Sequence, residues 1–199
     1  MVERKVKMNR RQFLYGTTAA AMPVLVSCGG DEFVVSIDDS YPVGRYGATS
    51  TAEEVTLGLD LTGKTAMVTG CNSGLGLETM RVLALRGAHV IGTGRTLEKA
   101  SKACSSVPGK TTPVALELSS LQSVIECADT IARLDIPIDI LVCNAGINTF
   151  GELVELVNGV EKTFVVNYLG HFVLVNRLMP LMNQAQESRI VHVGSMSAY

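Results

Sequence analysis

The chain has 199 residues, of which 47% are hydrophobic and 18% charged, which is enough for one good-sized globular domain and too short for two. Its net charge of −2 gives no reason to expect a nucleic acid or another polyanion as partner. Tryptophan is absent and there are only five Tyr and five Phe, so few aromatic side chains are available to stack on carbohydrates or bases.

The first 30 residues form a separate segment. Residues 1–12 are basic, and residues 13–26 are uncharged, largely apolar and shorter than the about 20 residues that a spanning helix needs. This is the layout of an export signal. Arg10-Arg11 within Asn9–Leu14 resembles a twin-arginine signal, and Leu25–Cys28 resembles a lipobox whose cysteine carries the lipid.

We therefore expect residues 1–30 to be an export leader, with a possible lipid anchor at Cys28 and a destination on the periplasmic side of the membrane. The alternative is a frayed or misassigned start, with Met8 as the first residue and a cytoplasmic protein. Residues 31–60 lack periodicity, and we expect them to be a linker or an N-terminal arm.

The five cysteines follow neither a disulfide pattern nor a metal-binding pattern. None are paired as Cys-x-x-Cys, and no Cys/His cluster has the spacing of zinc ligands, so no metal site is predicted. We expect free, buried or half-buried thiols at all positions except Cys28. Cys71 and Cys143 lie in two turns that matter below.

From residue 61 to residue 199 short apolar runs alternate with helical patterns. The runs predict strands at 65–69, 89–93, 112–116, 138–143 and 189–193. Helical periodicity appears at 75–86, 97–104, 121–134 and about 158–182. The apolar stripe of the last helix consists of Val160, Phe164, Tyr168, Phe172, Val175, Leu178, Met179 and Met182. The alternation predicts an α/β fold with a Rossmann-type doubly wound parallel sheet of order 3-2-1-4-5.

A glycine-rich turn between the first strand and the first helix predicts a dinucleotide site. It consists of Thr69, Gly70, Cys71, Asn72, Ser73, Gly74, Leu75 and Gly76. Gly70 suits a tight turn, Gly74 lets the backbone approach a pyrophosphate, and Gly76 lets the helix pack close to the sheet. The helix N-terminus favours phosphate. The alternative is a tight strand–helix turn that binds nothing.

The motifs together resemble the short-chain dehydrogenase/reductase family over about residues 60–199. The resemblance rests on the spacing Gly-x-x-x-Gly-x-Gly after Thr69, on Cys143-Asn144-Ala145-Gly146 and on Ser195 after the fifth strand. Residues 164–172 and 51–55 resemble the retinol-dehydrogenase-like branch. The resemblance implies that the glycine turn and Asn144, Ala145 and Gly146 bind a nicotinamide dinucleotide.

The end of the second strand favours NADP(H) over NAD. A carboxylate there would hydrogen-bond the ribose 2′-hydroxyl of NAD, but this chain has Gly94 followed by Arg95, which could pair with a 2′-phosphate. Otherwise Arg95 is a solvated loop residue. Glu117 stands where the family usually has an Asp that contacts the adenine amine. Glu is one methylene longer, so we expect the backbone of the neighbouring Leu118 to make that contact instead.

The family resemblance also assigns the catalytic residues. It implies that Asn167 anchors a water in a proton relay and that Ser195 hydrogen-bonds the substrate oxygen. The alternatives are an Asn satisfied by its local backbone and an ordinary turn serine. The family's proton donor is the tyrosine of a Tyr-x-x-x-Lys pair, and the sequence ends at Tyr199 before such a pair. We expect packing roles for the histidines, which are His89, His171 and His192.

The sequence thus predicts an NADP-dependent oxidoreductase, apparently truncated, that moves hydride between the nicotinamide and a carbonyl or alcohol. The branch resemblance suggests a lipophilic small molecule as substrate, and a homo-oligomer is possible for a longer chain. Because the proton donor is missing, we expect these 199 residues to be inactive alone. The alternative is a non-catalytic dinucleotide-binding module or an inactive fragment.

Overall fold

The computed structural model describes residues 44–47, 49–148 and 155–194. The chain divides into two compact units, Thr56–Val193 and a second that joins Met1–Val55 to Gly194–Tyr199. In the second unit the described part contains the short helix α2 (Ala52–Val55). The expected leader with Cys28, the residue Ser195 and Tyr199 lie outside the described residues.

The larger unit is built on one parallel sheet. Its strands are β1 (Thr65–Val68), β2 (His89–Gly94), β3 (Thr111–Ala115), β4 (Ile140–Cys143) and β7 (Arg189–His192). They pair in parallel in the order β3-β2-β1-β4-β7. This confirms the predicted α/β Rossmann-type fold with strand order 3-2-1-4-5.

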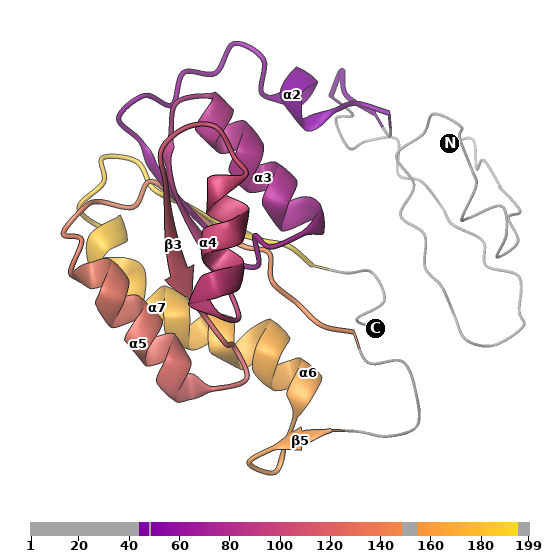
Figure 1. The fold of residues 1–199 in the computed structure, drawn as a ribbon, viewed down its shortest axis with the longest axis vertical. Coiled ribbons are helices and arrows are strands. Elements are labelled where there is room, and N and C mark those ends of the chain that lie inside the picture. Colours follow the sequence, from indigo (N-terminus) through magenta and orange to yellow (C-terminus); the bar gives the residue numbers. More distant parts are fainter. Residues whose placement is uncertain (1–43, 48, 149–154, 195–199) are drawn as a thin grey trace, which may run out of the picture. The chain divides into compact units, whose positions relative to one another are not determined.

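Helices cover both faces of the sheet because successive strand residues point to opposite sides. Met67, Ile91 and Leu141 pack with α5 (Leu121–Ala132) and α7 (Gly170–Met182) in one apolar cluster. Alternate residues, among them Val68, Val90 and Val142, pack with α3 (Gly74–Leu85) and α4 (Leu97–Ser105) in another. Figure 1 shows these helices as two pairs, α3 with α4 and α5 with α7. The core therefore consists of two layers separated by the sheet.

The helix α3 packs against the sheet mainly through residues other than the leucines at its two ends. Leu75 is 74% exposed and Leu85 is 44% exposed, whereas the buried residues are Gly76, Met80, Val82 and Ala84. Small side chains at both ends of this face let the helix lie close to the sheet. The bounds of the helix were predicted to within one residue.

The segment predicted as one long helix from about residue 158 begins as a hairpin instead. Strands β5 (Leu156–Val157) and β6 (Val160–Glu161) pair in antiparallel. Between them Asn158 and Gly159 have φ angles of 51° and 80°. An Asn-Gly pair with two positive φ angles is a strong hairpin signal, because this turn matches the twist of the strands.

The helical part that follows is interrupted by a π-helix. It runs as α6 (Lys162–Phe164), the π-helix η1 (Val165–Leu169) and α7. Phe164, Tyr168 and Phe172 stack on one another with ring centroids 5.1 and 6.2 Å apart, and all three are exposed. The predicted apolar stripe is therefore wrong for the aromatic residues and correct for Leu178 and Met182, which are buried.

Candidate functional site

The predicted binding residues follow four neighbouring strands. Residues 69–76 come after β1, Arg95 after β2, Glu117 and Leu118 after β3, and Asn144–Gly146 after β4. Since these strands are parallel, the loops meet at the carboxyl edge of the sheet, where ligands bind in open α/β folds. Figure 1 shows that β3 points toward the side on which α6 and β5 lie.

The glycine turn packs directly on the turn that follows β4. Gly70 has a φ of +71°, and a Cβ added to it would lie 2.9 Å from the Cβ of Ala145. A Cβ on Gly76 would collide with the carbonyl oxygen of Gly70 and lie 2.5 Å from Nδ2 of Asn144. Both positions therefore require glycine for close packing between the two turns.

The start of α3 is open to a ligand. Gly74 has a φ of +59°, and no atom lies within 4 Å of the position where its Cβ would be. Ser73 precedes the helix without capping it by a side-chain hydrogen bond. The first N–H groups of a helix have no intrahelical partner and carry the positive end of its dipole. An uncapped helix start beside a bare glycine fits the pyrophosphate of a dinucleotide.

Thr69 joins the two turns through its hydroxyl group. The side chain is fully buried, and Oγ1 accepts hydrogen bonds of 2.9 Å from the backbone N–H groups of Asn144 and Ala145. The Asn144 side chain returns a bond, because Nδ2 donates to the carbonyl oxygen of Thr69 over 2.9 Å. The Nε2 atom of His171 lies 3.0 Å from Thr69 Oγ1. The two turns therefore form one hydrogen-bonded body.

Asn167 lies in η1 and is exposed. Its Oδ1 accepts from the backbone N–H of Ile147, and its Nδ2 donates to the carbonyl oxygen of Ile147, both over 2.8 Å. The partner is thus 20 residues away, so the alternative of an Asn satisfied by its local backbone is wrong. Asn167 borders the Asn144–Gly146 turn, since a Cβ on Gly146 would lie 3.4 Å from its Oδ1.

Gly94 and Arg95 differ sharply in their surroundings at the end of β2. Gly94 is buried, and a Cβ there would lie 3.1 Å from the backbone nitrogen of Ala100. Arg95 is exposed, and in the described part of the chain no hydrogen bond or ion pair involves its side chain. The guanidinium group is therefore available to an anion.

The loop after β3 is organised by Glu117. Its Oε1 accepts from the backbone N–H of Ser119 over 3.0 Å and from the Ser119 hydroxyl over 2.8 Å. Leu118 is buried, and its carbonyl oxygen would lie 2.7 Å from a Cβ on Gly170. The carboxylate is thus engaged within its own loop.

The described cysteines are free and buried, as expected from their spacing. Burial raises the pKa of Cys71 and Cys127 to about 12 and that of Cys143 to about 11. In residues 44–47, 49–148 and 155–194 no group of three or more His, Cys, Asp or Glu side chains is placed to hold a metal ion. None of the helices within these same ranges has the length and apolar character to cross a bilayer.

The structure brings six residues of the predicted site together. It brings Thr69, Gly70 and Gly76 against Asn144 and Ala145 and places Asn167 beside them. His171 was missed as a polar participant. The signal that could have found it is its spacing, since a residue four positions after Asn167 lies on the same side of a helix.

The larger unit also matches known proteins. Residues 64–199 match the family model described as short chain dehydrogenase. The WW domain-containing oxidoreductase of Pongo abelii is 41% identical over 159 residues, which are 77% of this chain and 38% of that protein. Retinol dehydrogenase 13 of Mus musculus is 37% identical over 140 residues, or 68% of this chain and 42% of that protein. The chain thus spans less than half the length of both.

A solved structure with a similar fold contains the expected type of ligand. It is a 3-oxoacyl (acyl-carrier-protein) reductase from Agrobacterium tumefaciens C58 with NADP bound. It is 28% identical to this chain with a TM-score of 0.60, and the match covers 68% of this chain and 54% of that one. On the fold, the motifs and the family match, the chain belongs to the short-chain dehydrogenase/reductase family.

Proposed function

We propose that the chain is the dinucleotide-binding part of an NADP(H)-dependent oxidoreductase that moves hydride between the nicotinamide and a carbonyl or alcohol carbon. The observation that carries this proposal is the open start of α3, where Gly74 leaves free space and Ser73 makes no cap. The adjoining Thr69–Asn144–Ala145 network fixes the neighbouring turn by hydrogen bonds within the protein. A preorganised site of this kind lowers the cost of binding.

The preference for NADP(H) rests on two neighbouring residues. A carboxylate that would select NAD has little room at position 94, because the Ala100 backbone is 3.1 Å from where a Cβ would stand. Arg95 is exposed next to it and can pair with a 2′-phosphate by charge-assisted hydrogen bonds.

The substrate class is supported by likeness alone. One relative is a retinol dehydrogenase, which favours a lipophilic alcohol or carbonyl compound. The bound nicotinamide would supply the hydride, while Asn167 would hold a water of the proton relay. Ser195 lies outside the described residues, and its role toward the substrate oxygen stays a prediction. Binding of the dinucleotide involves the described turns alone, so the decisive test is one of binding.

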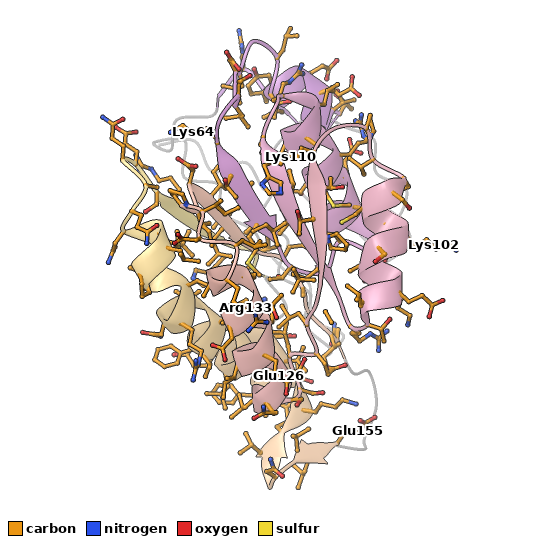
Figure 2. All side chains as sticks on the ribbon, turned by 60° about the vertical axis from the view of Figure 1, so that its left-hand side comes forward. Lys64, Lys102, Lys110, Glu126, Arg133 and Glu155 are labelled. Atoms are coloured by element: carbon orange, nitrogen blue, oxygen red, sulfur yellow. The ribbon has the colours of Figure 1, made fainter. Side chains whose placement is uncertain are left out.

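Calorimetric titration of the 199-residue chain with NADPH and NADH tests the proposal. We expect tighter binding of NADPH, and we expect Arg95→Ala to weaken it by about 1.5–3 kcal/mol, the value of a charge-assisted hydrogen bond. Lys102→Ala is the control, since Lys102 is an exposed cation in the last turn of α4 (Figure 2). Binding of neither nucleotide would refute the function, and tighter binding of NADH would refute the cofactor preference.

We also propose that the protein is exported by its first 30 residues and held at the membrane through a lipid on Cys28. The support is the Arg10-Arg11 pair and the apolar stretch that ends at Cys28, both outside the described residues. Fractionation of cells that express the wild type and an Arg10→Lys/Arg11→Lys variant tests this. A cytoplasmic, unlipidated wild type would contradict it.

A further inference from the structure

His171 connects the helical segment that carries Asn167 to the glycine turn that follows β1. It lies in the first turn of α7, is 3% exposed, and has a polar partner at each ring nitrogen. Nε2 lies 3.0 Å from Thr69 Oγ1, and Nδ1 lies 3.3 Å from the backbone oxygen of Asn167. One imidazole therefore bridges the glycine turn and the π-helix that carries Asn167.

The direction of these hydrogen bonds follows from the lone pairs of Thr69. Its oxygen already accepts from the N–H groups of Asn144 and Ala145, so both lone pairs are used. The hydroxyl hydrogen must then be donated, either to His171 at 3.0 Å or to the Val142 carbonyl at 3.5 Å. The shorter contact is the better one.

The other end of the ring gives the same answer. The backbone oxygen of Asn167 can only accept, so Nδ1 must carry a hydrogen if the 3.3 Å contact is attractive. The opposite tautomer would aim a third donor at Thr69 Oγ1 and set the bare Nδ1 against a carbonyl oxygen. Both ends therefore select a neutral ring with hydrogen on Nδ1.

We propose that His171 is a positioning residue whose Nε2 accepts the Thr69 hydroxyl hydrogen and so holds the Thr69 oxygen toward the two N–H groups of the Asn144–Ala145 turn. Through Nδ1 the same ring fixes the backbone of Asn167. His171 thus couples the shape of the dinucleotide site to the helix that carries the catalytic asparagine. This inference rests on the proposed function of the two turns.

A packing role alone does not account for the arrangement. An apolar side chain of similar size would leave the buried Thr69 hydroxyl with only the 3.5 Å contact to Val142. A buried donor without a good partner is costly, so the threonine would turn or its turn would shift. Burial also lowers the pKa of His171. The hydrogen bond to the Asn167 backbone raises this pKa and the charge of His192 lowers it further, and the net lowering favours the neutral ring.

Two variants separate the acceptor from mere bulk. His171→Gln keeps an oxygen acceptor close to the position of Nε2, whereas His171→Leu removes it. We expect His171→Leu to weaken NADPH binding roughly tenfold and His171→Gln to restore most of the loss. The matched control is His89→Leu, because Nε2 of His89 lies 2.8 Å from Thr112 Oγ1 at the opposite, amino-terminal end of the sheet. Equal affinities for His171→Leu and His89→Leu, or equal losses for Leu and Gln at position 171, would overturn the inference.

Nitrogen NMR of the histidine ring provides a second readout that needs no nucleotide. We expect the His171 signals of a neutral ring protonated at Nδ1 in the wild type and a change of tautomer population in Thr69→Val, which lacks the hydroxyl. A wild-type ring protonated at Nε2 would refute the inference even if NADPH binds. If the wild type binds no nucleotide but shows the Nδ1–H ring, the positioning contact stands while the proposed function fails.

Discussion

The side chain of Asn167 and the backbone of Ile147 exchange two hydrogen bonds of 2.8 Å, one in each direction. The amide thus occupies the place that a neighbouring strand would take beside Ile147. Because Ile147 follows the Asn144–Gly146 turn, this pair attaches η1 to the binding edge of the sheet.

Replacing Asn167 with Leu should lower the free energy of unfolding by about 1–3 kcal/mol, since two hydrogen bonds are lost at a site that is open to water. Chemical denaturation followed by circular dichroism measures this. The control is Asn176→Leu, which loses one exposed bond to the Phe172 carbonyl within the same helix. A loss for Asn167→Leu no larger than that of the control would show that the Ile147 contact contributes little.

The glycines at 76 and 74 should respond differently to alanine. At Gly76 the added methyl group meets the Gly70 oxygen and the Asn144 amide, so we expect a loss of several kcal/mol or failure to fold. At Gly74 the space is open and only the left-handed conformation opposes alanine, at about 1 kcal/mol. Thermal unfolding compares the two. Similar losses at both positions would contradict the packing argument.

Stability should fall in acid because of His171. Burial disfavours the imidazolium and lowers its folded pKa, so the unfolded chain binds the proton more readily. The contribution is therefore complete above the ordinary histidine pKa of about 6.5 and is lost as pH falls from there toward the folded pKa. Denaturation between pH 5 and 7 measures the slope. His171→Gln should flatten it.

The pKa of His89 is also lowered by burial, with a smaller effect from Lys110, so His89→Gln should remove a separate share of the slope. The two variants therefore serve as controls for each other. A slope that His171→Gln leaves unchanged would mean that this ring does not contribute to the acid sensitivity.

The amino-terminal end of the sheet depends on Asp139. One carboxylate oxygen accepts from Lys64 Nζ and the other from the backbone N–H of Thr65, both over 2.9 Å. Figure 2 shows Lys64 at the end of the domain away from Glu155. Asp139→Ala should cost about 1–3 kcal/mol, because it leaves the buried Thr65 N–H without that partner.

Asp139→Asn is the milder variant, since its amide oxygen can still accept from Thr65. Lys64→Met should cost less than Asp139→Ala, because the Lys64 side chain is 43% exposed and an ion pair open to water contributes little. Denaturation curves for the three variants give the order. A larger loss for Lys64→Met than for Asp139→Ala would contradict it.

The strands and their order could be predicted because β1, β2 and β4 are short apolar runs set between turn residues. A glycine in the left-handed region, Gly87 with a φ of +95°, ends α3 where the sequence indicated. The prediction of one long helix after Val157 was wrong for a physical reason. Phe164, Tyr168 and Phe172 recur every four residues, so they imitate a buried helical face although they lie on the exposed side.

The site was predictable where backbone geometry demands glycine and less so where side chains act on distant backbone. At Gly70 and Gly76 the residue type itself indicates that the backbone packs too closely for a side chain. Asn167 and His171 take their partners from loops 20 and 102 residues away, and no local pattern shows which atoms these loops present. The fold had to be known before either partner could be named.

The π-helix sets the angular phase between two contacts. Asn167 inside it reaches Ile147, and His171 just after it reaches Thr69. A residue inserted into or removed from a helix rotates everything beyond it by about 100°, one step of a 3.6-residue turn. In a regular α-helix Asn167 and His171 would lie about 40° apart around the axis, and the π-helix between residues 165 and 169 changes this angle. The wider turn thus sets the angle at which one continuous helix presents Asn167 to Ile147 and His171 to Thr69.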